Sequence, residues 1–163
     1  MKQFVLVIFG LFFIVFAQAQ DQKTPVSLTT GLTIPILDNG LGLHVGLNPA
    51  WGISEHFYLE GQLSYLYTRV GASFLSGEKS NSHAFNALVG GRLYLNAANQ
   101  ENRFYLNWLL GGNYQREIED SGSATDQFGL GFSGGGYWQR KAFLLGLSYD
   151  TPQNLVLKTG YVF

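Results

Sequence analysis

The sequence predicts an all-β protein, an eight-stranded antiparallel up-and-down transmembrane β-barrel that follows a cleaved signal peptide. Eight segments alternate apolar and polar residues with a period of two, which is the pattern of a β-strand. Charged residues make up only 13% of the chain, whereas aromatic residues make up 15% and glycines number 21. The last segment alternates up to an aromatic residue, Phe163. We expect this strand to pair with the first one, so that the barrel has no open edge.

The N-terminal segment, residues 1–19, is predicted to be a secretory signal peptide. A short basic start precedes an apolar run from Phe4 to Phe16 and an Ala-x-Ala site that ends at Ala19. The run is shorter than the ~20 residues that a transmembrane helix needs. We expect cleavage after Ala19, which leaves residues 20–163 as the barrel domain. Loss of Lys2 leaves nine of the 10 basic side chains against 11 acidic ones, a charge of −2.

The composition argues against a nucleic-acid partner and against stabilisation by disulfides. A slightly acidic chain lacks the basic surface that nucleic-acid partners require, so no nucleic-acid partner is expected. The chain has no cysteine, so disulfides do not stabilise it, and closure of a barrel within a membrane supplies another source of stability. The mean hydropathy is only +0.05. A low mean hydropathy is compatible with a membrane β-barrel, because only every second residue of each strand faces lipid.

Turn signals separate the expected strands. Asp38-Asn39-Gly40 is a tight-turn sequence, Ser54-Glu55-His56 and Gln139-Arg140-Lys141 are short polar turns, and longer polar loops are expected at 71–83 and 115–126. The expected strands are 26–34, 41–51, 57–69, 84–96, 103–114, 127–138, 142–150 and 155–163. Because the two longest loops follow odd-numbered strands, they lie on one side, which we take as extracellular, with both termini periplasmic.

Within each strand, one set of alternate positions is apolar and is expected to face lipid. The first strand places Val26, Leu28, Thr30, Leu32 and Ile34 on one face. The expected outward residues of the others include Leu41, Leu43, Val45, Leu47, Leu59, Leu63, Ala87, Val89, Leu93, Leu95, Leu106, Leu110, Leu130, Leu145 and Leu147. The expected inward residues include Gly42, His44, Gly46, Asn48, Gln62, Ser64, Thr68, Asn86, Tyr94, Ser133 and Asp150. The inward face is therefore polar, as in outer-membrane barrels.

Aromatic residues gather near the strand ends. This distribution predicts two girdles at the membrane interfaces, because bilayer interfaces favour amphipathic rings. Trp51, Phe57, Phe104, Trp138, Phe143 and Phe163 form the expected periplasmic girdle, and Tyr65, Tyr67, Phe85, Tyr114, Phe128 and Tyr149 the opposite one. Trp108 and Phe132 are expected near the middle of an outward face.

With its eight alternating segments, unequal loops and terminal aromatic strand, the chain resembles the small eight-stranded outer-membrane β-barrels of Gram-negative bacteria, of the OmpA/OmpX type. The resemblance implies a porin-like outer-membrane protein of the cell envelope, in contact with outer-membrane lipids and lipopolysaccharide. It also implies that Tyr161 and Phe163 belong to a signal that the barrel-assembly machinery reads.

The expected interior carries three charged side chains, Glu60, Arg92 and Lys158. An eight-stranded barrel is just wide enough for side chains to fill it, and charges there must be paired to limit the cost of desolvation. We expect Glu60 to pair with Arg92 or with Lys158. We also expect Gly129, Gly131 and Gly135 to leave room for Arg92 or Tyr137.

Sites for catalysis, cofactors and metals are not indicated. The histidines do not have metal-ligand spacing, and the glycine pairs lack the helix that a phosphate loop needs. Ser82 and His83 are adjacent, so on a strand they face opposite sides, which is unfavourable for a Ser–His nucleophile. We therefore expect a non-enzymatic membrane barrel with a structural or surface-interaction role. A lipid A-modifying enzyme, a narrow channel and a soluble lipocalin-like binder are the alternatives.

Overall fold

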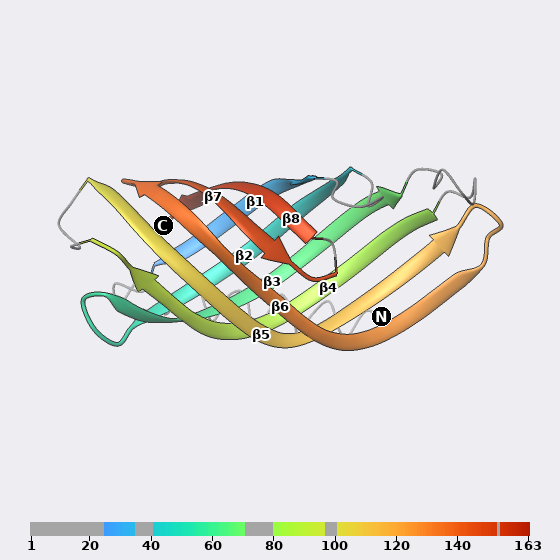
Figure 1. Ribbon diagram of the computed structural model, residues 1–163, viewed down its shortest axis with the longest axis horizontal. Coiled ribbons are helices and arrows are strands. Elements are labelled where there is room, and N and C mark those ends of the chain that lie inside the picture. Colours follow the sequence, from blue (N-terminus) through green and yellow to red (C-terminus); the bar gives the residue numbers. More distant parts are fainter. Residues whose placement is uncertain (1–24, 35–40, 71–79, 97–100, 153) are drawn as a thin grey trace.

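The computed structural model describes residues 25–34, 41–70, 80–96, 101–152 and 154–163 as a single closed barrel (Figure 1). The predicted signal peptide lies outside these residues. The described residues include no helix with the length and hydrophobicity needed to span a membrane. The strands are β1 Val26–Ile34, β2 Gly42–Gly52, β3 Phe57–Val70, β4 Ser80–Tyr94, β5 Asn102–Glu119, β6 Ala124–Arg140, β7 Phe143–Asp150 and β8 Asn154–Val162.

Each strand pairs antiparallel with its neighbours in chain order, and β8 pairs with β1 to close the barrel. The closing register sets Leu28 opposite Tyr161 and Gly31 opposite Lys158. The predicted closed barrel of eight antiparallel strands, including the pairing of the last strand with the first, is confirmed. Closure satisfies both edges of the sheet, which is the condition for a β-structure to lie in lipid.

The outer face of the barrel wall is apolar, whereas the interior holds the buried polar and charged side chains together with apolar ones such as Leu66, Leu109 and Leu144. On β7 the outward side chains Phe143, Leu145, Leu147 and Tyr149 are exposed, whereas Leu144, Gly146, Ser148 and Asp150 are buried. The same alternation runs along β1 and β3–β5. Four residues are exceptions, since they are buried at positions that the register assigns to the outer face: Val26, Leu47, Pro49 and Gly91. The predicted face of each strand is otherwise found in the structure.

Three strands are longer than the sequence predicts, which corrects the expected loops. β4 begins at Ser80, and β5 and β6 extend to Glu119 and from Ala124, so most of the expected loop 115–126 is a β-hairpin. Polar side chains join the extended strands: the Ser80 hydroxyl donates to Glu117 Oε1 at 2.7 Å, and Gln115 Nε2 donates to Ser82 Oγ at 3.1 Å. The alternation of apolar residues ends there, and the extension is held by these polar contacts and by the pairing of β5 with β4 and β6.

The barrel wall is tall on one side and low on the other. β5 and β6 pair along their full length, but β6 pairs with β7 only from Ser133, which lies opposite Asp150. At the right of Figure 1 the β5–β6 hairpin therefore extends beyond the end of β7. Phe128 and Leu130, on the part of β6 without a β7 partner, are 84% and 91% exposed.

Candidate functional site

The half of the interior nearer the chain ends holds a buried ion pair between β3 and β4. Arg92 Nε lies 2.9 Å from Glu60 Oε2, and Arg92 Nη2 donates to Glu60 Oε1 at 2.9 Å. Asn48 Nδ2 donates to the same carboxylate at 3.0 Å. Both charged side chains are buried. The two parallel hydrogen bonds are the strongest geometry available to an Arg–carboxylate pair, and they offset the desolvation of both charges.

A row of aromatic residues fills the barrel beside this pair. The register sets Tyr94, Tyr105 and Tyr137 side by side on β4, β5 and β6. The rings of Tyr105 and Tyr137 stack at 4.8 Å, and the Arg92 guanidinium lies 4.4 Å from the centre of the Tyr105 ring. Because a ring face attracts a cation, Tyr105 adds to the stabilisation of Arg92. The alternation pattern placed Tyr94 inside, but nothing in the sequence indicated the stacking.

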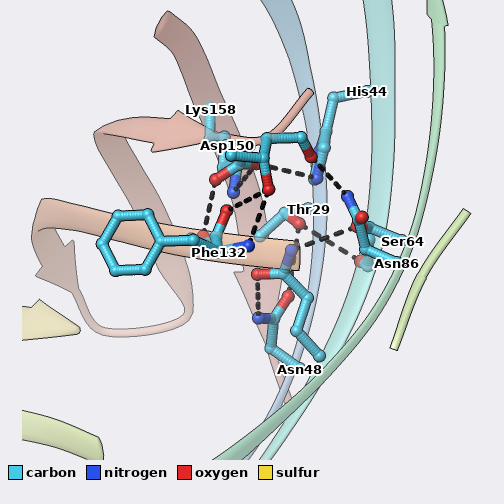
Figure 2. Close-up of polar contacts among 12 residues, drawn as sticks. Thr29, His44, Asn48, Ser64, Asn86, Phe132, Asp150 and Lys158 are labelled. Atoms are coloured by element: carbon cyan, nitrogen blue, oxygen red, sulfur yellow. Dashed lines mark hydrogen bonds and ion pairs between the residues drawn. The ribbon is translucent and has the colours of Figure 1, made fainter. Parts of the chain in front are cut away.

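The second buried network joins β2, β6, β7 and β8. Figure 2 shows Asp150, Lys158 and His44 converging inside the barrel. Lys158 Nζ lies 2.6 Å from Asp150 Oδ2, the Ser133 hydroxyl donates to Asp150 Oδ1, and His44 Nε2 lies 3.6 Å from Asp150 Oδ2. Lys158 thus pairs with Asp150, and Glu60 pairs with Arg92. The sequence placed Asp150 on the inner face without assigning it as the partner of Lys158.

Glycines make room for these large inward side chains. A Cβ on Gly46 would meet the His44 ring at 2.8 Å, so the missing side chain leaves space for that ring. Gly146 lies opposite Tyr137. The glycines named from the sequence are in other surroundings: a Cβ on Gly131 would meet Leu88, one on Gly135 would meet Ser148, and one on Gly129 would meet nothing within 4 Å. That expectation was wrong, because which residue lies opposite depends on the register rather than on strand alternation.

We expect Gly146→Ala to destabilise the barrel by about 1–3 kcal/mol, the usual cost of inserting a methyl group into a packed interior. The added Cβ would approach the Tyr137 ring to within 2.1 Å, and the stacked Tyr105 ring limits the movement of Tyr137. Gly112→Ala is the matched control, because a Cβ there meets nothing within 4 Å. Urea unfolding in lipid vesicles measures the stability of both variants. Equal urea midpoints for the two variants would contradict the expected clash with Tyr137.

Ser82 and His83 lie on opposite faces of β4. Ser82 is buried and accepts a hydrogen bond from Gln115 Nε2, whereas His83 Nδ1 lies 2.7 Å from Tyr65 Oη on the outer wall. The His83 ring also packs against Tyr67, with ring centres 5.2 Å apart. The two side chains do not form a nucleophile–base pair. Among the described residues, no group of three His, Cys, Asp or Glu side chains could hold a metal ion.

Aromatic side chains gather near both ends of the outer wall. Toward the hairpin tip, ring contacts link Tyr65, Phe85, Tyr114 and Phe128 in sequence across β3 to β6. Toward the chain ends, Phe104 lies opposite Trp138, whose ring contacts that of Phe143 at 6.2 Å. Trp51, Phe57 and Tyr149 are also on the outer face. Phe132 lies at the middle of β6, as expected, and its ring contacts that of Tyr149 at the top of the β6–β7 pairing because β7 ends there.

The last strand is fixed on both sides. Tyr161 lies between Phe143 of β7 and Leu28 of β1, and its ring contacts Phe163 at 5.0 Å. The amide of Phe163 donates to the carbonyl oxygen of Val26 at 2.9 Å. Both aromatic residues are exposed on the outer wall. The segment proposed as an assembly signal is therefore part of the seam that closes the barrel.

Comparison by sequence finds no match: no protein-family model and no curated protein matches the chain. Comparison by structure does. Ail, the attachment invasion locus protein of Yersinia pestis, superposes with a TM-score of 0.55 at 16% identity, over 86% of this chain and 97% of that one. A structure of Ail with the heparin analogue sucrose octasulfate gives a TM-score of 0.53 at 14% identity, over 86% of this chain and 99% of that one.

A second solved β-barrel has a similar fold. The N-terminal β-barrel domain of Pseudomonas aeruginosa OprF superposes with a TM-score of 0.50 at 14% identity, over 87% of this chain and 98% of that one. At such low identity the likeness concerns the fold. The strand order, the closure of the barrel and its apolar outer face agree with this likeness. The chain has the fold of the small eight-stranded outer-membrane β-barrels.

Proposed function

We propose that this chain is an integral outer-membrane β-barrel with a structural or surface-interaction role and no catalytic activity. In this proposal residues 1–19 are removed, both ends of the chain are periplasmic, and the β5–β6 hairpin projects from the cell. Side chains close the lumen, because the Glu60–Arg92 pair, the tyrosine row and the Asp150–Lys158 pair occupy it.

The inverted polarity of the wall is the observation that carries the proposal. An aliphatic band with exposed leucines lies between the two aromatic girdles, while charged side chains are buried inside. In water this arrangement would expose a large apolar surface, which soluble monomers avoid. In a bilayer the band contacts acyl chains and the aromatic rings lie at the headgroups. Outer-membrane lipids and lipopolysaccharide are therefore the proposed contacts of the wall.

A surface role is assigned to the projecting hairpin. Residues 115–126 contain Glu117, Glu119, Asp120 and Asp126 but a single basic residue, Arg116. This excess of negative charge favours cations or a basic partner and disfavours a sulfated sugar of the kind that Ail binds in its complex. The opposed directions of Ser82 and His83 support a non-catalytic role.

We expect the protein in the outer-membrane fraction to migrate faster on a gel when unboiled than when boiled. A closed barrel resists detergent at room temperature and stays compact, and boiling unfolds it. Gel mobility of fractionated cells, boiled against unboiled, measures this, with a soluble periplasmic protein as the control for the fractionation. Recovery in the soluble fraction with no mobility shift would contradict the proposal.

A further inference from the structure

Aromatic residues mark the two boundaries of the apolar outer wall, one toward the chain ends and one toward the hairpin tip. These two boundaries do not run parallel around the barrel. Toward the chain ends the boundary is level from β5 to β7, because Phe104 lies opposite Trp138 and Trp138 contacts Phe143. Toward the hairpin tip, β6 contributes a different boundary residue to each of its two neighbouring strands. Phe128 contacts Tyr114 of β5 at 4.8 Å, but the aromatic residue of β6 that contacts Tyr149 of β7 is Phe132, at 6.5 Å.

The apolar wall is therefore much lower at β7 than at β5. The two boundary aromatics of β5, Phe104 and Tyr114, are ten positions apart, whereas those of β7, Phe143 and Tyr149, are six apart. With a rise of ~3.3 Å per residue and a strand tilt of ~40°, these spans correspond to heights of about 25 Å and about 15 Å. The first matches the usual apolar band of an outer-membrane barrel, ~25 Å, and the second is well below it.

The wall beyond Tyr149 has no further lipid-facing residue on β7. Asp150 turns inward to Lys158, and the chain then leaves the strand at Thr151. Thr151 caps the seam, because its amide donates to the Phe132 carbonyl oxygen at 2.9 Å and its hydroxyl accepts from the Phe132 amide at 2.6 Å. Acyl chains at this level would contact polar backbone and lie close to a buried ion pair, which hydrocarbon disfavours.

We propose that the seam between β6 and β7 is a bilayer-thinning face, made of Phe132, Phe143, Leu145, Leu147 and Tyr149. Its partner is the outer-leaflet lipid, which it compresses, so that short or disordered acyl chains are favoured beside it. Tilting the barrel moves both boundaries together and leaves their separation unchanged. The membrane must therefore adapt, as it does around short apolar spans. This inference rests on the proposed membrane location.

Two spin labels at matched positions test the inference. The chain has no cysteine, so Tyr149→Cys and Leu110→Cys each give a unique site for a nitroxide. Tyr149 lies six positions beyond Phe143, and Leu110 lies six positions beyond Phe104. Both labels are therefore at the same height above the aromatic boundary that lies toward the chain ends. Each labelled protein is reconstituted in dioleoylphosphatidylcholine vesicles after its heat-dependent gel shift has been verified. Power saturation with oxygen and with a nickel chelate then gives the depth of the label.

We expect the Leu110 label to lie about 10 Å deeper than the Tyr149 label, the height of four strand positions. In thinner dilauroylphosphatidylcholine bilayers the Leu110 label should become shallower, while the Tyr149 label changes little because the bilayer beside it is already thin. Two labels at equal depth would overturn the thinning face and leave the membrane barrel standing. Two labels that both contact the aqueous nickel chelate freely would overturn the membrane location itself.

Discussion

Glu60→Ala is expected to lower the stability of the barrel by about 3–5 kcal/mol, the cost of breaking a buried ion pair from one side. Arg92 would keep its charge in the interior but lose both hydrogen bonds to the carboxylate. The contact with the Tyr105 ring remains but is worth less than the lost charge pair. The temperature at which the compact gel band disappears and the urea midpoint in vesicles both measure the loss.

The controls separate charge from packing. Glu101→Ala removes the same carboxylate from a solvent-exposed position, 4.0 Å from Lys141, and should change stability by no more than about 1 kcal/mol. The double variant Glu60→Leu with Arg92→Met removes both buried charges and should recover much of the loss, since apolar replacements of buried pairs are tolerated. A Glu60→Ala protein as stable as Glu101→Ala would show that the pair does not hold the interior together.

Asp150→Asn is the second substitution with a large expected effect, again about 3–5 kcal/mol. The change keeps the shape of the side chain but leaves Lys158 without a carboxylate, and Lys158 is buried. The Tyr137 hydroxyl, 3.5 Å away, is neutral and does not replace the lost negative charge. Urea unfolding of the reconstituted protein, followed by tryptophan fluorescence, measures the effect.

Asp126→Asn provides the matched comparison. Asp126 makes an exposed pair with Arg116 at 3.8 Å, and its side chain is 52% exposed. Water screens such a pair, so its loss should cost no more than about 1 kcal/mol. If Asp126→Asn were the more damaging of the two, the hairpin rather than the interior would dominate the stability of the fold.

The sequence predicts the architecture well because alternation with a period of two is a local property. Inward and outward faces could be assigned from neighbours in sequence, and Glu60, Arg92 and Lys158 are buried in the structure. Partners could not be assigned in the same way. Lys158 contacts Asp150 because of how β7 and β8 are staggered, and the stagger depends on how the closed sheet is sheared.

Strand ends were the least predictable feature for a related reason. The segments around Ser80, Gln115 and Thr125 are polar and read as loops, yet they continue β4, β5 and β6. Their pairing depends on hydrogen bonds between strands, such as Ser80 to Glu117, which leave no periodic apolar pattern.

The tall β5–β6 hairpin also bears on how the barrel enters a membrane. Its tip, at Asp120–Ser123, lies at the end of the barrel opposite to both chain ends. A chain inserted from the side of its ends must carry Glu117, Glu119 and Asp120 across the hydrocarbon before the barrel can close. Each charge costs free energy during that passage, although none remains in lipid afterwards. Under the proposed orientation, we expect translocation of this hairpin to be a kinetic barrier to insertion.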